Sequence, residues 1–119
     1  MKTFLSLTAI LEGATGIALI LTPQFIVQLL LSTPLDGNGG IIATRVAGIA
    51  ITSLALGCWF SRNEKSSGIL VSLLFYNFAI IAIFLDAFFV YSISGIFLWL
   101  VISAHIVFGV WGIIKMRKL

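Results

Sequence analysis

Long apolar stretches alternate with short polar breaks along the whole chain. A helix needs about 20 largely apolar residues to cross the hydrocarbon core of a bilayer, and four stretches reach that length. They run from about Thr3 to Leu21, from about Gly40 to Phe60, from about Gly68 to Val90 and from about Gly95 to Ile114. The pattern therefore predicts an all-α fold, an integral membrane four-helix bundle, with residues 1–119 forming a single transmembrane domain.

The connection after the first stretch predicts a short additional helix. Thr22 and Pro23 have the residue types of an N-cap followed by a first-turn proline. Gln24, Gln28 and Ser32 then recur every four residues among apolar neighbours. Because this segment is too short to span a bilayer, we expect an interfacial helix with its glutamine stripe toward water. A kinked extension of the first helix past Pro23 is the alternative.

The composition points in the same direction. Hydrophobic residues make up 61% of the chain and charged residues 9%, and the mean hydropathy is +1.20. Soluble domains carry about 25% charged residues, so a soluble globule is excluded. A disordered chain is excluded because disorder is marked by low hydrophobicity and high charge. The single cysteine, Cys58, excludes an internal disulfide. The expected partners are membrane lipids, with other membrane subunits or self-association as further alternatives, and no nucleic acid, because no basic face is present.

The basic residues predict the orientation. With four crossings, six of the seven lie on one side and none on the other, while Arg45 falls within a span. The positive-inside rule then places both termini in the cytoplasm. We expect the protein to lie in a plasma membrane, the inner membrane of a bacterium. The six residues are Lys2, Arg62, Lys65, Lys115, Arg117 and Lys118.

Four ionisable residues fall within the spans, where each is costly and therefore a functional candidate. They are Glu12, Arg45, Asp86 and His105. A helical rise of about 1.5 Å per residue places Glu12 and His105 roughly 13–15 Å below the outer ends of their helices. The same rise places Arg45 and Asp86 at roughly 6 Å. The Arg45 side chain is long enough to reach either acid. We expect it to form an outer ion pair with Asp86 or to extend toward Glu12.

Small-residue stripes place three of these side chains along packing seams between helices. On the third span, Asn77 and Asp86 are nine residues apart and so lie on opposite helix faces. We therefore expect Tyr76 and Asn77 to face the interior, with Asp86 either near Arg45 or in the outer headgroup region. The predicted polar cluster consists of Glu12, Arg45, Tyr76, Asn77 and His105.

This cluster has two main interpretations. It is either a network that holds the helices in register, or a site that binds the polar head of a lipophile or moves a proton through Glu12 and His105. A partner interface is a third reading. A single histidine without a CxxCH motif does not indicate haem. No group of metal ligands and no nucleophile–base arrangement is visible, so we expect no cofactor, no metal and no catalytic activity.

Segments of this chain resemble two known families of membrane proteins. The segment ATRVAGIAITSLALGCWFSR, with Arg45 followed three residues later by Gly48, resembles the second helix of DoxX-like small bacterial membrane proteins. The first helix, which ends at a proline, fits the same plan. The resemblance implies a four-helix protein of similar length and carries almost no mechanism. If the polar cluster binds a ligand, we expect Arg45 and His105 to form hydrogen bonds with the ligand's polar head.

Glu12, in AILEGATG, is similar to the first-helix glutamate of small multidrug resistance transporters. That resemblance implies proton exchange against cationic drugs. The segment LLFYNFAIIAIF lacks those transporters' aromatic-and-glycine motif, and Arg45 and His105 have no role in their scheme. The sequence therefore predicts an accessory subunit or a protein that binds a small lipophile, such as a lipid or quinone. A proton-coupled transporter using Glu12 is the alternative.

Overall fold

The computed structural model describes residues 1–119 and contains five helices and no strands. They are α1 (Lys2–Leu21), α2 (Pro23–Leu31), α3 (Asn38–Ser61), α4 (Ser67–Tyr91) and α5 (Ile96–Arg117). Four of them, α1, α3, α4 and α5, are long and apolar enough to cross a membrane. The predicted all-α bundle with a short helix after the first span is confirmed, and α5 extends beyond the expected Ile114 to Arg117.

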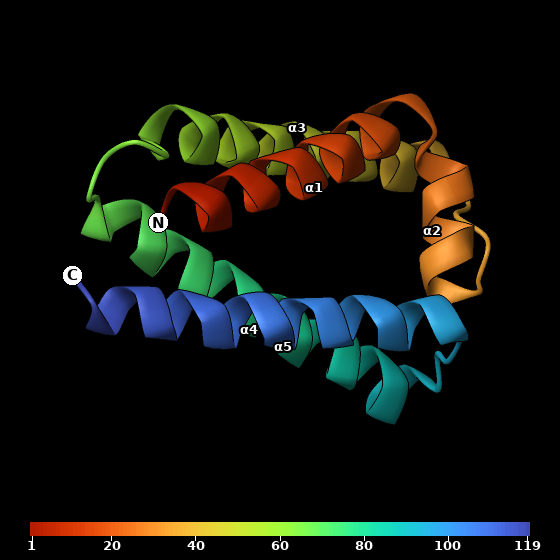
Figure 1. The fold of residues 1–119 in the computed structure, drawn as a ribbon. Coiled ribbons are helices and arrows are strands. Elements are labelled where there is room, and N and C mark those ends of the chain that lie inside the picture. Colours follow the sequence, from red (N-terminus) through yellow and green to blue (C-terminus); the bar gives the residue numbers. More distant parts are fainter.

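The four long helices form two pairs. Helix α1 packs along α3, and α4 packs along α5, while α2 bridges the pairs at one end (Figure 1). Only 16 of the 119 residues are buried, and many large apolar side chains are exposed. In lipid such a surface needs no cover, because hydrocarbon tails are as apolar as the side chains. The pairing of the helices therefore depends on close packing at a few places.

The pairs meet at the end that holds both termini. A core of fully or almost fully buried side chains joins them there, and it draws on α1, α3 and α4. Aromatic side chains of α5 close it, with the ring of Phe4 5.2 Å from that of Trp111 and 6.1 Å from that of Phe108, centroid to centroid. The core residues are Phe4, Leu5, Ala9, Cys58, Leu70 and Leu73.

Helix α2 lies across the opposite end of the molecule (Figure 1). Helix α1 ends at Leu21, and Thr22 leaves helical geometry with φ −132° and ψ 58°, so the chain turns before Pro23 starts the new helix. The far end of α2 touches the start of α5, where a Cβ added at Gly95 would meet the Ser32 Oγ. The kinked continuation of α1 is therefore not formed, and Gln24 and Gln28 are exposed as expected.

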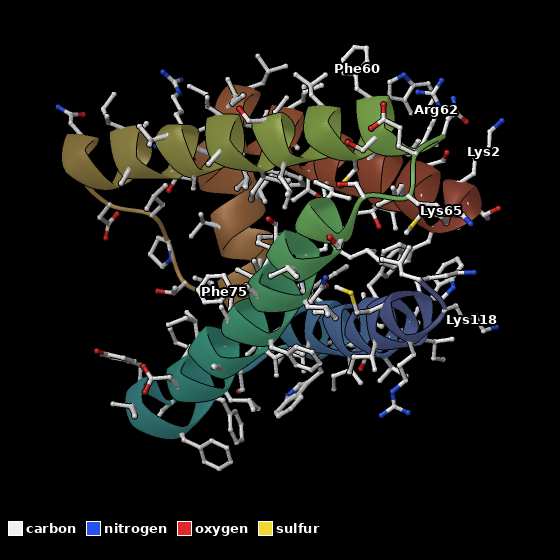
Figure 2. All side chains as sticks on the ribbon, turned by 90° about the vertical axis from the view of Figure 1, so that its left-hand side faces the viewer. Lys2, Phe60, Arg62, Lys65, Phe75 and Lys118 are labelled. Atoms are coloured by element: carbon white, nitrogen blue, oxygen red, sulfur yellow. The ribbon has the colours of Figure 1, made fainter.

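The basic side chains gather at the end with the termini. Figure 2 shows Lys2, Arg62, Lys65 and Lys118 together on one side of the molecule. The pKa of the Met1 amino group is lowered by burial and by the nearby positive charge of Lys115, and Figure 1 shows both termini at this end. The two helical pairs thus have one basic end and one end closed by α2.

Candidate functional site

A cavity of about 580 Å³ lies between the two helical pairs. Apolar side chains provide 16 of its 21 lining residues, drawn from all five helices. Ile26, Leu29 and Leu30 of α2 form its far wall, so the short helix acts as a cap over the cavity. Leu11 of α1 and Leu100 of α5 line it and remain 51% and 56% exposed, which marks an opening between these two helices.

Four of the five residues of the predicted polar cluster meet in this cavity. The Tyr76 hydroxyl donates to Glu12 Oε2 at 2.9 Å, which joins α4 to α1. His105 Nδ1 lies 2.9 Å from Asn77 Oδ1, which joins α5 to α4. The Tyr76 and His105 rings meet edge to face at 5.5 Å between centroids. The polar contacts therefore link three helices across the middle of the bundle.

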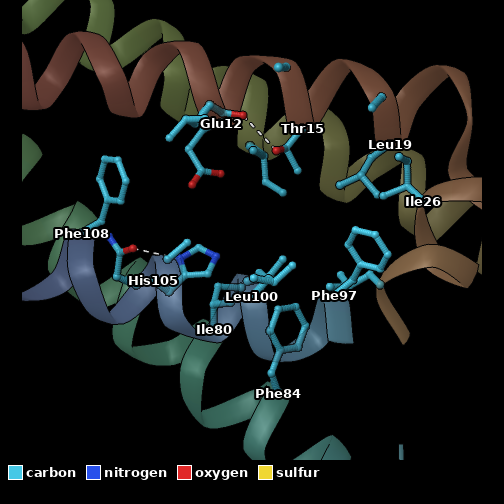
Figure 3. A pocket seen from close by; sticks show the side chains of 18 of the residues that line it. Glu12, Thr15, Leu19, Ile26, Ile80, Phe84, Phe97, Leu100, His105 and Phe108 are labelled. Atoms are coloured by element: carbon cyan, nitrogen blue, oxygen red, sulfur yellow. Dashed lines mark hydrogen bonds between the residues drawn. The ribbon is translucent and has the colours of Figure 1, made fainter. Parts of the chain in front are cut away.

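The acid and the imidazole approach from opposite sides. In Figure 3, Glu12 points from α1 toward His105 on α5, with the apolar walls of the cavity beyond them. No hydrogen bond joins the two side chains directly. Both are partly buried, and the space between them belongs to the cavity, which both of them line.

The other polar side chains of the cavity are bonded within their own helices. The hydroxyl of Thr8 donates to the Phe4 carbonyl oxygen, and that of Thr15 donates to the Leu11 carbonyl oxygen, both at 2.9 Å. Such bonds to the carbonyl four residues earlier satisfy a hydroxyl without a neighbouring helix. Neither threonine therefore adds a free donor to the cavity.

Arg45 lies outside this cluster. Helix α3 packs on α1 through Gly48, Thr52 and Ala55, and Arg45 precedes this seam and is exposed. It does not line the cavity. Asp86 on α4 is also exposed, and no salt bridge joins the two. The structure thus separates Arg45 from the residues that the sequence grouped with it.

The cavity also contains aromatic side chains that the sequence did not single out. Phe84, Phe97 and Phe108 line it and lie on α4 and α5. Their positions have no distinctive sequence signal, because phenylalanine occurs ten times in the chain. The structure contains no group of three or more side chains placed to hold a metal ion. The site is a largely apolar cavity with a small polar floor, which consists of Glu12, Tyr76, Asn77 and His105.

Comparison with protein-family models, with curated proteins and with solved structures finds no match to this chain. The arguments that follow therefore start from the geometry of the cavity.

Proposed function

We propose that this protein binds a small lipophile in the cavity between its two helical pairs. One observation carries the proposal: an apolar cavity of about 580 Å³ ends on a polar floor that includes Glu12 and His105. Ligand cavities in proteins span about 300–1,000 Å³ and combine apolar walls with a few polar groups that orient the ligand. The role is binding, without a catalytic step of its own.

The position of the polar floor favours a lipophile with a small, uncharged head. The floor lies toward the middle of the spans, whereas the charged head of a phospholipid belongs at the membrane surface. Moving such a head into hydrocarbon surroundings costs much more free energy than moving a neutral polar group. A quinone or another neutral lipid meets this condition.

Filling the cavity tests the proposal. Ala104 lines the cavity on α5, and we expect Ala104→Phe to lower the amount of co-purifying lipophile at least tenfold, because the added ring occupies its place. Native mass spectrometry after gentle extraction from the membrane measures the bound mass.

Val107→Phe is the matched control, because Val107 lies one turn further along α5, is 61% exposed and does not line the cavity. Equal bound mass in the wild type and in both variants would contradict binding in this cavity. An additional protein on the complex would instead support the accessory-subunit role.

Proton-coupled transport is the second candidate, and the position of Glu12 favours it. Its carboxyl group faces the cavity, where Tyr76 donates to one oxygen. A transporter of this type must lose proton flux on Glu12→Gln while it stays folded. Retained flux in proteoliposomes that contain Glu12→Gln would rule this mechanism out.

We further propose that the protein lies in a bacterial inner membrane with its basic end in the cytoplasm. The asymmetry of Lys and Arg supports this orientation, since both termini lie at the basic end of the molecule.

Labelling of an introduced cysteine checks this orientation. A membrane-impermeant maleimide should label Asp36→Cys in intact cells, and it should label Lys118→Cys only after the cells are permeabilised. The unmodified chain is the control, because its one cysteine, Cys58, is fully buried. The reverse labelling pattern would overturn the orientation.

A further inference from the structure

The hydrogen bonds around Asn77 determine which nitrogen of His105 carries a proton. Asn77 is almost fully buried, and its Nδ2 donates to the Leu73 carbonyl oxygen at 2.7 Å. Its Oδ1, an acceptor, therefore faces His105 Nδ1. An acceptor requires a donor opposite it, so His105 Nδ1 carries the proton, and Nε2 of the neutral imidazole bears a lone pair.

This Nε2 is accessible from the cavity. Figure 3 shows the second ring nitrogen of His105 on the side of the ring that faces the cavity, away from the dashed hydrogen bond. No buried side-chain nitrogen or oxygen in the protein lacks a hydrogen-bond partner. Nε2 and the second carboxyl oxygen of Glu12 have no partner within the chain, so neither atom is fully buried, and both side chains line the cavity.

Each donor side chain that lines the cavity already donates one hydrogen bond within the protein, and the second N–H of Asn77 Nδ2 belongs to a side chain that is only 3% exposed. The hydroxyls of Thr8 and Thr15 donate to their own helix, the Tyr76 hydroxyl donates to Glu12, and Asn77 Nδ2 donates to the backbone. What the floor offers a ligand is the lone pair of His105 Nε2 and one oxygen of Glu12. That oxygen accepts a hydrogen bond when the carboxyl group is ionised and can donate one when it is protonated.

A hydroxyl group can bond both of these atoms when Glu12 is protonated, and one of them when Glu12 is ionised. It carries one donor and two acceptor lone pairs, so it can donate to His105 Nε2 and also accept from a protonated Glu12. A ketone or an ether has no donor, so it leaves the lone pair of Nε2 without a partner. An ammonium group has donors but must give up its hydration shell among apolar walls, at a higher cost.

We propose that the cavity selects a lipophile with a neutral hydroxyl group, a phenol above all, and binds that hydroxyl between Glu12 and His105. The preference for a phenol follows from the rings of Phe84, Phe97 and Phe108 along the walls, since aromatic rings pack favourably edge to face or offset. This inference rests on the proposed function, because it names the chemistry of the ligand that the cavity receives.

The test uses the fact that His105 is the only histidine. Protein labelled with ¹⁵N-histidine, purified and returned to lipid nanodiscs, gives one pair of ring nitrogen signals. Without ligand, we expect Nδ1 to be protonated and Nε2 to be unprotonated. A protonated Nε2 with an unprotonated Nδ1 would overturn the proposal before any ligand is added.

The ligands are 4-octylphenol and its methyl ether, 4-octylanisole, in which a methyl group replaces the hydroxyl proton. We expect the phenol to shift the Nε2 signal and to bind about tenfold more tightly than the ether, because the ether leaves the acceptors of the floor unpaired. His105→Phe should bring the affinity for the phenol down to that for the ether. Octylammonium should bind more weakly than the phenol.

The possible failures are distinguishable. Equal binding of the phenol and the ether without a shift of Nε2 would overturn the selection of a hydroxyl and leave the binding of lipophiles standing. Tighter binding of octylammonium would also overturn it and favour a cationic substrate. If neither aromatic ligand binds and the cavity contains only water, the proposed function fails and this inference fails with it.

Discussion

Replacing Phe4 by alanine is expected to lower the free energy of unfolding by about 3 kcal/mol, because Phe4 joins the two helical pairs. Its side chain is fully buried on α1, and its ring packs against Phe108 and Trp111 of α5. Phe→Ala changes in protein cores cost about 3–5 kcal/mol. The lower end applies here, because in lipid the transfer of an apolar group contributes little and the lost packing dominates.

The measurement is unfolding of the purified protein in mixed micelles, with the loss of helical circular dichroism as the signal. Phe75→Ala is the matched control, because Phe75 is on α4, is 76% exposed and points away from the bundle (Figure 2). We expect that variant to change stability by less than about 0.5 kcal/mol. Equal losses in Phe4→Ala and Phe75→Ala would show that Phe4 does not join the pairs.

The Phe4 change should also weaken ligand binding. Phe108 lines the cavity and packs on Phe4, so a void at Phe4 lets this wall relax toward the core. Binding and stability are therefore expected to fall together in Phe4→Ala, whereas Ala104→Phe should lose binding with its stability largely retained.

The sequence was sufficient for the helices, because the membrane imposes a strong rule on them. A spanning segment must be long, apolar and helical, and the four predicted stretches coincide with α1, α3, α4 and α5 to within a few residues. Thr22 and Pro23 marked the start of α2 for an equally local reason. These signals depend on neighbouring residues only.

The polar cluster was recognisable in part. Glu12 and His105 stood out because ionisable residues are rare in spans, and the nine-residue spacing separated Asn77 from Asp86. The structure brings Glu12, Tyr76, Asn77 and His105 together. Depth along a helix follows from the sequence through the rise per residue, so groups at one depth can be matched.

Arg45 shows what the sequence could not supply. Its depth was predictable, but the partner of its helix was not, because small residues allow close packing without specifying against which helix. Helix α3 uses its small residues against α1, so Arg45 is left outside the cavity. The cavity itself depends on the separation of the two pairs, and no single segment encodes that separation.

Gly16→Ala is expected to lower the free energy of unfolding by about 2 kcal/mol, since it inserts an atom into the closest contact between α1 and α3. A Cβ at Gly16 would meet the Thr52 Oγ1, and it would lie 2.7 Å from the Gly48 carbonyl oxygen and 2.8 Å from the Thr52 nitrogen. Two of these atoms belong to the backbone and cannot rotate away, so the helices must separate.

Gly13→Ala is the control on the same helix. Its Cβ would lie 3.6 Å from the Ala55 Cβ, an ordinary contact, and alanine favours a helix over glycine by up to about 1 kcal/mol. The two substitutions make the same chemical change. Gly16→Ala should lower the melting temperature, whereas Gly13→Ala should raise it or leave it unchanged. A fall of equal size in both would contradict the close seam at Gly16.

Gly48→Ala probes the same seam from α3, because its Cβ would lie 2.7 Å from the Gly16 carbonyl oxygen. Once one alanine has pushed the helices apart, the second meets less resistance, so the double variant should lose less stability than the two single losses added. Since Glu12 lies one turn from Gly16, this displacement also moves its carboxyl group out of its present position relative to Tyr76. Weaker ligand binding should therefore accompany the loss of stability in Gly16→Ala but not in Gly13→Ala.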